Sequence, residues 1–164
     1  MLELLRHCTL CPRECGVDRL DGKTGFCGVS GENVRVARAA LHHWEEPCLS
    51  GSRGSGAVFF AGCPLRCVFC QNRAISRGAA GKEIPISRLA EIFLELQEQK
   101  AHNLNLVTPT HYVPQIVLAL RLAKEQGLSI PVVFNCGGYE KPETLRLLEG
   151  LVDVWLPDYK YLSG

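Results

Sequence analysis

Residues 57–72 read AVFFAGCPLRCVFCQN. The run over 57–62 is short, apolar and rich in Val and Phe, which predicts a buried strand. Three cysteines follow at once, Cys63, Cys67 and Cys70, spaced C-x3-C-x2-C, and no fourth cysteine lies nearby. The stretch therefore predicts a strand that ends in a loop carrying three thiol ligands.

After this loop, helix-like and strand-like segments alternate. Apolar residues at helical spacing predict helices over 86–99, 113–127 and 141–150, and apolar runs predict strands over 103–109, 131–135 and 152–157. Ser87 is the expected N-cap of the first helix, and Gly127 is expected to close the second. Alternation of this kind, with short loops, predicts parallel β/α units.

The predicted fold class is α/β, a partial (β/α) TIM-type barrel of about four units. Functional groups of such folds gather at the carboxyl ends of the strands. The unusual residue groups of this chain fall there: the cysteine loop, TPTH at 108–111, NCGGY at 135–139 and PDYK at 157–160.

The first 50 residues form a small Cys-rich segment with a strand-like run over 34–44. The flexible stretch SGSRGSG over 50–56 is the expected boundary, which divides the chain into a metal-binding-like segment, 1–50, and a partial barrel, 51–164.

Within the segment four cysteines are spaced C-x2-C-x3-C-x11-C: Cys8, Cys11, Cys15 and Cys27. They can close a zinc site or hold an auxiliary iron–sulfur cluster, and the alternative is unliganded thiols on a flexible arm. Because the segment is short and polar, bound metal would supply its folding energy.

Composition narrows the class of protein. The chain has 164 residues and a net charge of +1, which gives no support for a nucleic-acid or membrane-surface partner. It shows no signal peptide and no run of about 18 apolar residues, so we expect a cytoplasmic protein. Because disulfides do not persist in the cytoplasm, the nine cysteines are first interpreted as metal ligands.

Three thiolates with no fourth suit a 4Fe–4S cubane. They hold three irons and leave the fourth open for a substrate or cofactor. The alternatives are a zinc site completed by a distant ligand, or three reduced thiols.

The motif C-x3-C-x-aromatic-C directly after a first strand resembles the signature of radical S-adenosylmethionine (SAM) enzymes. The longer strings CTLCPRECGVDR, GCPLRCVFCQN, NLNLVTPTHYVPQI and GGYEKPETLRLLEGLVDVWLPDYKY resemble the subgroup related to pyruvate formate-lyase activating enzyme. This resemblance implies a 4Fe–4S cluster on Cys63, Cys67 and Cys70, with SAM on the open iron. It also implies that Phe69 lies against the adenine.

Further roles follow from the same resemblance. Asp158 and Lys160 match a D-x-K element expected to contact SAM, and the alternative is a strand-end salt bridge. The family usually has a Gly-Gly-Glu element after the second strand that holds the SAM ammonium, but this chain has Thr108, Thr110 and His111 there and no carboxylate. Thr108 and Asn135 are candidate SAM contacts. His111 is a candidate general acid or base, the alternative being a solvated loop histidine.

The implied activity is an oxidoreductase reaction. SAM is cleaved reductively to a 5′-deoxyadenosyl radical, which abstracts hydrogen from a partner protein or another substrate, with electrons from a flavodoxin- or ferredoxin-type donor. The family barrel has about six units and this sequence stops at Gly164, so we expect impaired catalysis and an unpaired edge on the strand over 152–157. The alternative function is a non-catalytic iron–sulfur or zinc module that docks on another chain.

Overall fold

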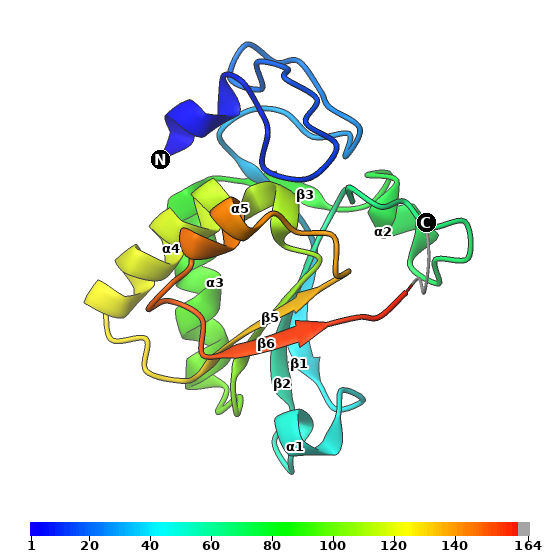
Figure 1. Ribbon diagram of the computed structural model, residues 1–164. Helices are drawn as coiled ribbons and strands as arrows, with labels where there is room; N and C mark the ends of the chain where they lie inside the picture. Colours follow the sequence, from blue (N-terminus) through cyan, green and yellow to red (C-terminus); the bar gives the residue numbers. More distant parts are fainter. Residues whose placement is uncertain (161–164) are drawn as a thin grey trace.

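The computed structural model describes residues 1–160 (Figure 1). A mixed sheet forms its centre, short helices and loops surround it, and the Cys-rich segment lies at one end. Within the described range no helix is both long and apolar enough to span a membrane. In chain order the elements are η1 Leu2–Leu5, β1 Val34–His42, α1 Pro47–Ser50, β2 Ser55–Phe60, α2 Arg73–Ser76, β3 Lys82–Ile84, α3 Ile86–Glu98, β4 Leu104–Val107, η2 Thr110–Tyr112, α4 Val113–Glu125, β5 Val132–Cys136, α5 Pro142–Arg146 and β6 Val154–Pro157.

The sheet has the strand order β3-β1-β2-β4-β5-β6 and is open. The four strands predicted from the sequence, β2, β4, β5 and β6, pair in parallel. Strands β1 and β3 extend the sheet in antiparallel fashion. The mixed α/β class is therefore confirmed, and β6 is an edge strand of the described sheet. The number of units in a complete barrel stays a prediction.

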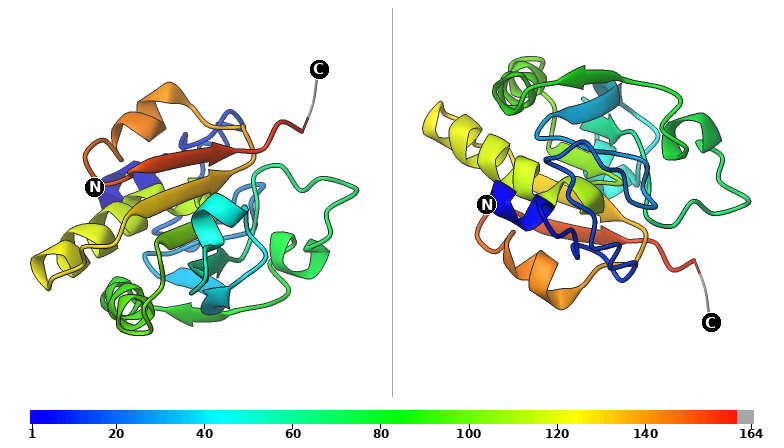
Figure 2. Two further views of the ribbon diagram at one scale, coloured as in Figure 1. Left: turned by 90° about the horizontal axis from the view of Figure 1, so that it is seen from below. Right: turned by 90° about the horizontal axis from the view of Figure 1, so that it is seen from above.

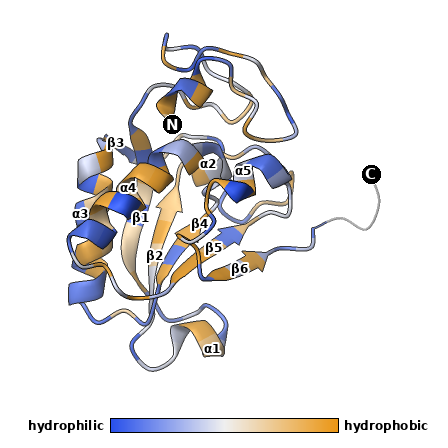
Figure 3. Ribbon diagram, turned by 60° about the vertical axis from the view of Figure 1, so that its left-hand side comes forward, coloured by the Kyte–Doolittle hydropathy of each residue, from blue (hydrophilic) through white to orange (hydrophobic). Residues whose placement is uncertain are grey.

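The main helices α3 and α4 pack against one side of the sheet (Figure 2). In α3 the spacing of Leu89, Phe93 and Leu96 puts all three on one face, where they are buried against the sheet. The hydrophilic residues of α3 lie on its outer side (Figure 3). This burial, with Leu104 and Phe134 from the strands, builds the core and fixes the register of the parallel strands.

Local details differ from the sequence prediction. Ser87 lies inside α3, and the N-cap is Pro85, whose extended backbone precedes the helix. The third helix, α5, is shorter than predicted and ends at Arg146. The strand-like run before the expected boundary is β1, which pairs with β2 along its length, so the two sides of residues 50–56 share one sheet.

The Cys-rich segment covers the carboxyl ends of the parallel strands, and α1 lies at the opposite end (Figure 1). Arg13 Nε donates to the carbonyl of Pro64 in the cysteine loop at 3.0 Å. In α5, Thr144 Oγ1 donates to the Leu10 carbonyl at 2.8 Å. The segment is thereby attached to the loop after β2 and to helix α5.

Candidate functional site

A cavity of about 470 Å³ opens at the carboxyl ends of the parallel strands. Its size is in the range usual for small-molecule sites. Its walls come from the cysteine loop and from the loops after β1, β4, β5 and β6. The predicted site residues that line it are Cys63, Cys67, Phe69, Cys70, Thr108, Asn135, Asp158 and Lys160.

The cysteine loop leaves β2 at a point where a side chain cannot fit. Gly62 has φ +85°, and a Cβ there would lie 2.7 Å from the Cys27 carbonyl oxygen. The backbone N–H of Leu65 donates to Cys63 Sγ at 3.4 Å, and that of Cys70 donates to the Cys67 carbonyl at 3.2 Å. The loop therefore turns the backbone N–H of Leu65 toward the Cys63 sulfur and closes a turn between Cys67 and Cys70.

The three thiols lie close enough to influence one another. Burial raises the pKa of Cys63, backbone donors of Arg66 and Leu65 lower it, and Cys67 and Cys70 raise it further. A bound cationic group would offset the burial and the mutual repulsion, because ligating thiols must be deprotonated.

The donor set fits a cubane. Among residues 1–160 no three His, Cys, Asp or Glu side chains converge closely enough to hold one metal ion. A cubane distributes three thiolates over three irons, so its three ligands need not converge on a single ion. All three candidate ligands are cysteine thiols, the usual ligand type of a 4Fe–4S cluster.

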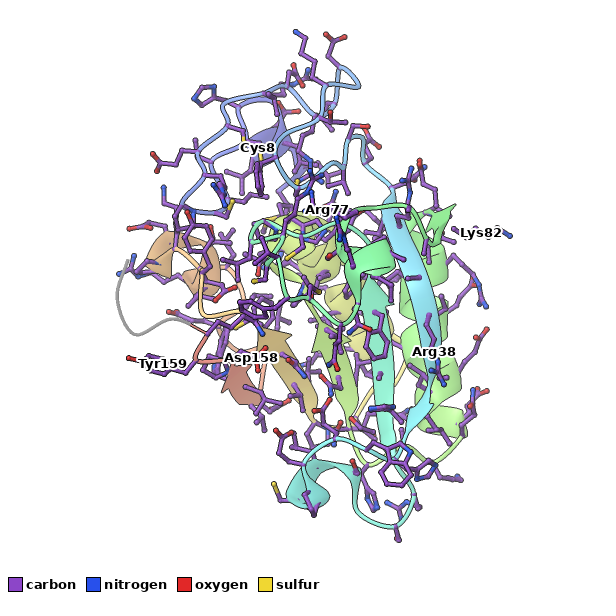
Figure 4. The ribbon with its side chains drawn as sticks, turned by 90° about the vertical axis from the view of Figure 1, so that its right-hand side faces the viewer. Cys8, Arg38, Arg77, Lys82, Asp158 and Tyr159 are labelled. Carbon is purple, nitrogen blue, oxygen red and sulfur yellow. The ribbon has the colours of Figure 1, made fainter. Side chains whose placement is uncertain are left out.

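Asp158 and Lys160 follow β6 and form an ion pair of 2.5 Å. The Asp158 N–H donates to the Cys136 carbonyl at 2.8 Å, which extends the β5–β6 ladder and fixes the carboxylate at the cavity. Burial opposes the charge of Lys160, but Asp158, Cys67 and Cys70 together raise its pKa. The strand-end salt bridge considered as an alternative is thus present, and both partners face the cavity (Asp158 is labelled in Figure 4).

The other predicted contacts also reach the cavity. Thr108 has φ +56°, uncommon for a β-branched residue, and its N–H donates to the Asn135 carbonyl at 2.9 Å. Phe69 is 63% exposed at the cavity mouth, where a flat ring can receive a ligand.

Two carboxylates in the cavity wall were missed from the sequence. Glu140 accepts a hydrogen bond from Thr110 Oγ1 at 2.7 Å. Glu45 accepts from Asn105 at 2.7 Å and from Asn135 at 3.3 Å. Burial raises the pKa of Glu45. The sequence did contain a signal for Glu140. The loop after β4 has no carboxylate, and Glu140 lies in the loop after the next parallel strand, β5. Nothing in the sequence places Glu45 beside Asn135.

His111 does not line the cavity. It is 2% exposed, and its Nε2 donates to the Ala61 carbonyl at 2.9 Å, so Nδ1 is the unprotonated nitrogen. Burial lowers the pKa of His111 to about 3, the bond to Ala61 opposes this, and Arg19 adds to it. The alternative of a solvated histidine is wrong, because the ring is buried. A buried neutral ring away from the cavity supports β2 and gives no support to general acid or base catalysis.

Comparisons with known proteins agree with this site. Residues 57–157, more than half of the chain, match the model of the family described as the radical SAM superfamily. The chain is also 32% identical over 167 aligned residues to a protein of Methanocaldococcus jannaschii that is itself named only as uncharacterized. That alignment covers 96% of this chain and 46% of the relative, so the chain spans about half of the relative's length.

Proposed function

The chain belongs to the radical SAM superfamily, whose enzymes use a 4Fe–4S cluster and SAM, and on this premise we propose an activating-enzyme-like role. In this role SAM is cleaved reductively and a hydrogen atom is taken from a partner protein. The single observation that carries the proposal is the convergence of the cysteine loop, Phe69, Asp158 and Lys160 on one cavity.

In this proposal Cys63, Cys67 and Cys70 would hold the cluster, which would supply the electron for reductive cleavage of the C–S bond of SAM. The Lys160 ammonium pairs with the SAM carboxylate, and Asp158 accepts from a hydroxyl or amino group. Asp158 also holds Lys160 in place, because the two already form an ion pair. The adenine lies against Phe69, whose ring is exposed at the cavity mouth.

Glu140 is proposed to receive the SAM ammonium. The loop after β4 has no carboxylate, but its Thr110 hydroxyl binds Glu140 and brings that carboxylate to the same side of the cavity. A carboxylate oriented by a hydroxyl donor is a strong acceptor for an ammonium group.

Exposed apolar side chains at the cavity support a macromolecular substrate. Trp44 and Phe69 both line the cavity and are 90% and 63% exposed, and Val68, next to Phe69 in the cysteine loop, is 87% exposed. Large apolar side chains exposed around a site favour contact with another protein chain. The electron donor is proposed to be of the flavodoxin or ferredoxin type.

The test is anaerobic reconstitution with iron and sulfide, followed by reduction with dithionite in the presence of SAM. We expect 5′-deoxyadenosine and methionine in the wild type, formed at the low rate that impaired catalysis implies and measured by liquid chromatography with mass spectrometry, and neither product in Cys70→Ala. A folded wild-type protein that carries the cluster but leaves SAM intact under these conditions would support a non-catalytic iron–sulfur module instead.

A further inference from the structure

Arg19 is a completely buried arginine, with 0% of its surface exposed. Its Nη1 donates to the His111 carbonyl at 2.6 Å. Within residues 1–160, Nε and Nη2 have no hydrogen-bond partner, and no nitrogen of Arg19 donates to a carboxylate. A guanidinium keeps its charge inside proteins. A buried cation without a counter-charge is strongly unfavourable, so the surroundings must supply negative charge.

Two kinds of side chain near Arg19 can become negative: the Tyr112 phenol, whose ring centre lies 5.7 Å from the guanidinium carbon, and cysteine thiols. Burial raises the pKa of Tyr112 to about 12, so the thiols are the groups that can carry the negative charge. Arg19 Nη1 lies 4.0 Å from Cys8 Sγ. The guanidinium therefore lies beside the first of the four cysteines of the segment (Cys8 is labelled in Figure 4).

Backbone hydrogen bonds hold together the loops that carry these cysteines. The N–H of Cys8 donates to the Val17 carbonyl at 3.1 Å, and the N–H of Gly16 donates back to the Cys8 carbonyl at 3.0 Å. The Phe26 N–H donates to Cys15 Sγ at 3.4 Å, which connects the residue before Cys27 to Cys15. In the described structure residues 6–33 contain no helix or strand, so a ligand that joins these loops would contribute strongly to their folding.

We propose that Cys8, Cys11, Cys15 and Cys27 hold a tetrathiolate metal centre whose net negative charge is the counter-ion of buried Arg19. Four thiolates around a divalent zinc ion or a 4Fe–4S core leave a net negative charge, and Arg19 then donates N–H bonds to coordinated sulfur. Zinc and the cluster share this chemistry. A zinc ion requires all four thiolates to converge on one tetrahedral centre, whereas a cluster distributes them over four irons.

The centre is also connected to the cysteine loop. Arg19 binds the His111 carbonyl, and the His111 ring binds Ala61, two residues before Cys63. The Cys27 carbonyl packs where a side chain on Gly62 would lie. Metal in the segment therefore stabilises the start of the loop that lines the cavity.

The experiment uses the full chain with Cys63, Cys67 and Cys70 all changed to Ala. This variant removes the ligands of the proposed radical site, so the metal that remains reports on the segment alone. The protein is purified without oxygen and its zinc and iron are measured by mass spectrometry. We expect about one zinc, or about four irons with thiolate-to-iron absorption, per chain. We also expect loss of this metal when Cys11 and Cys27 are changed to Ala as well. A folded triple variant with neither metal would overturn the proposal.

A second measurement tests the charge of Arg19 in the same background. Arg19→Met removes the charge at similar length, and Arg19→Lys is the control that keeps it. We expect Arg19→Met to release metal to a chelator at least about tenfold faster than the parent, and to be no less stable than the parent once both are metal-free. Arg19→Lys should release metal at a rate closer to that of the parent. Equal release rates in the parent and Arg19→Met would contradict the counter-ion role.

Discussion

Replacing His111 by Gln removes a buried titratable ring and keeps a donor for the Ala61 carbonyl. Burial lowers the pKa of His111 from 6.5 to about 3. Between these values the unfolded chain binds a proton that the folded chain does not, so stability falls as the pH falls below 6.5 and levels off near pH 3. At pH 5 this difference amounts to about 2 kcal/mol of unfolding free energy, and at pH 7.5 to almost none.

The assay is urea denaturation at pH 7.5 and pH 5, in a background that lacks Cys63, Cys67 and Cys70 so that acid release of cluster iron does not contribute. Between pH 7.5 and pH 5 the unfolding free energy of the parent should fall by about 2 kcal/mol more than that of His111→Gln. His43→Gln, at an exposed position, is the control and should follow the parent. Identical pH dependence in the parent and His111→Gln would refute a buried, neutral His111.

Three further predictions concern the site and the core. Glu140→Gln should raise the Kd for SAM about tenfold in equilibrium dialysis, because a charge-assisted hydrogen bond to the SAM ammonium is lost. Glu143→Gln, at an exposed position, is the control and should leave the Kd unchanged. Equal Kd values in the wild type and Glu140→Gln would exclude the ammonium contact. Gly62→Ala should lower iron incorporation at the cysteine loop, since the added Cβ would lie 2.7 Å from the Cys27 carbonyl oxygen. Gly22→Ala is the control, because a Cβ there would have no atom within 4 Å. Equal iron contents in the two variants would count against close packing of Gly62 on Cys27. Phe93→Ala should cost about 3–5 kcal/mol of unfolding free energy in urea denaturation, and a loss below about 1 kcal/mol would mean that α3 does not form the core.

The sequence was sufficient to predict the elements that depend on a pattern of neighbouring residues. The parallel strands and α3 follow from apolar spacing within a few residues, and the cysteine loop from ligand spacing. The three-residue strand β3, with two exposed residues of its three, carries no such pattern and forms because β1 offers an edge to pair with. Ser87 was misplaced as an N-cap because Pro85 fixes the extended backbone two residues earlier.

The missed site residues depend on contacts between distant parts of the chain. Glu45 and Asn135 are 90 positions apart in the sequence, and only the folded sheet brings them within hydrogen-bond distance. Arg19 lies in a polar, glycine-rich segment that predicts an exposed side chain, yet it is buried because it reaches the carbonyl of His111. Tertiary burial of a charged residue has no signal in local composition.

The central claim, that Cys63, Cys67 and Cys70 hold a cluster with an iron open to SAM, is tested most directly by electron paramagnetic resonance. The reduced, anaerobically reconstituted protein is measured with and without SAM, beside a Cys70→Ala control. We predict a reduced 4Fe–4S signal that changes on addition of SAM in the wild type only. A signal that SAM leaves unchanged, or one that responds equally in Cys70→Ala, would contradict the account.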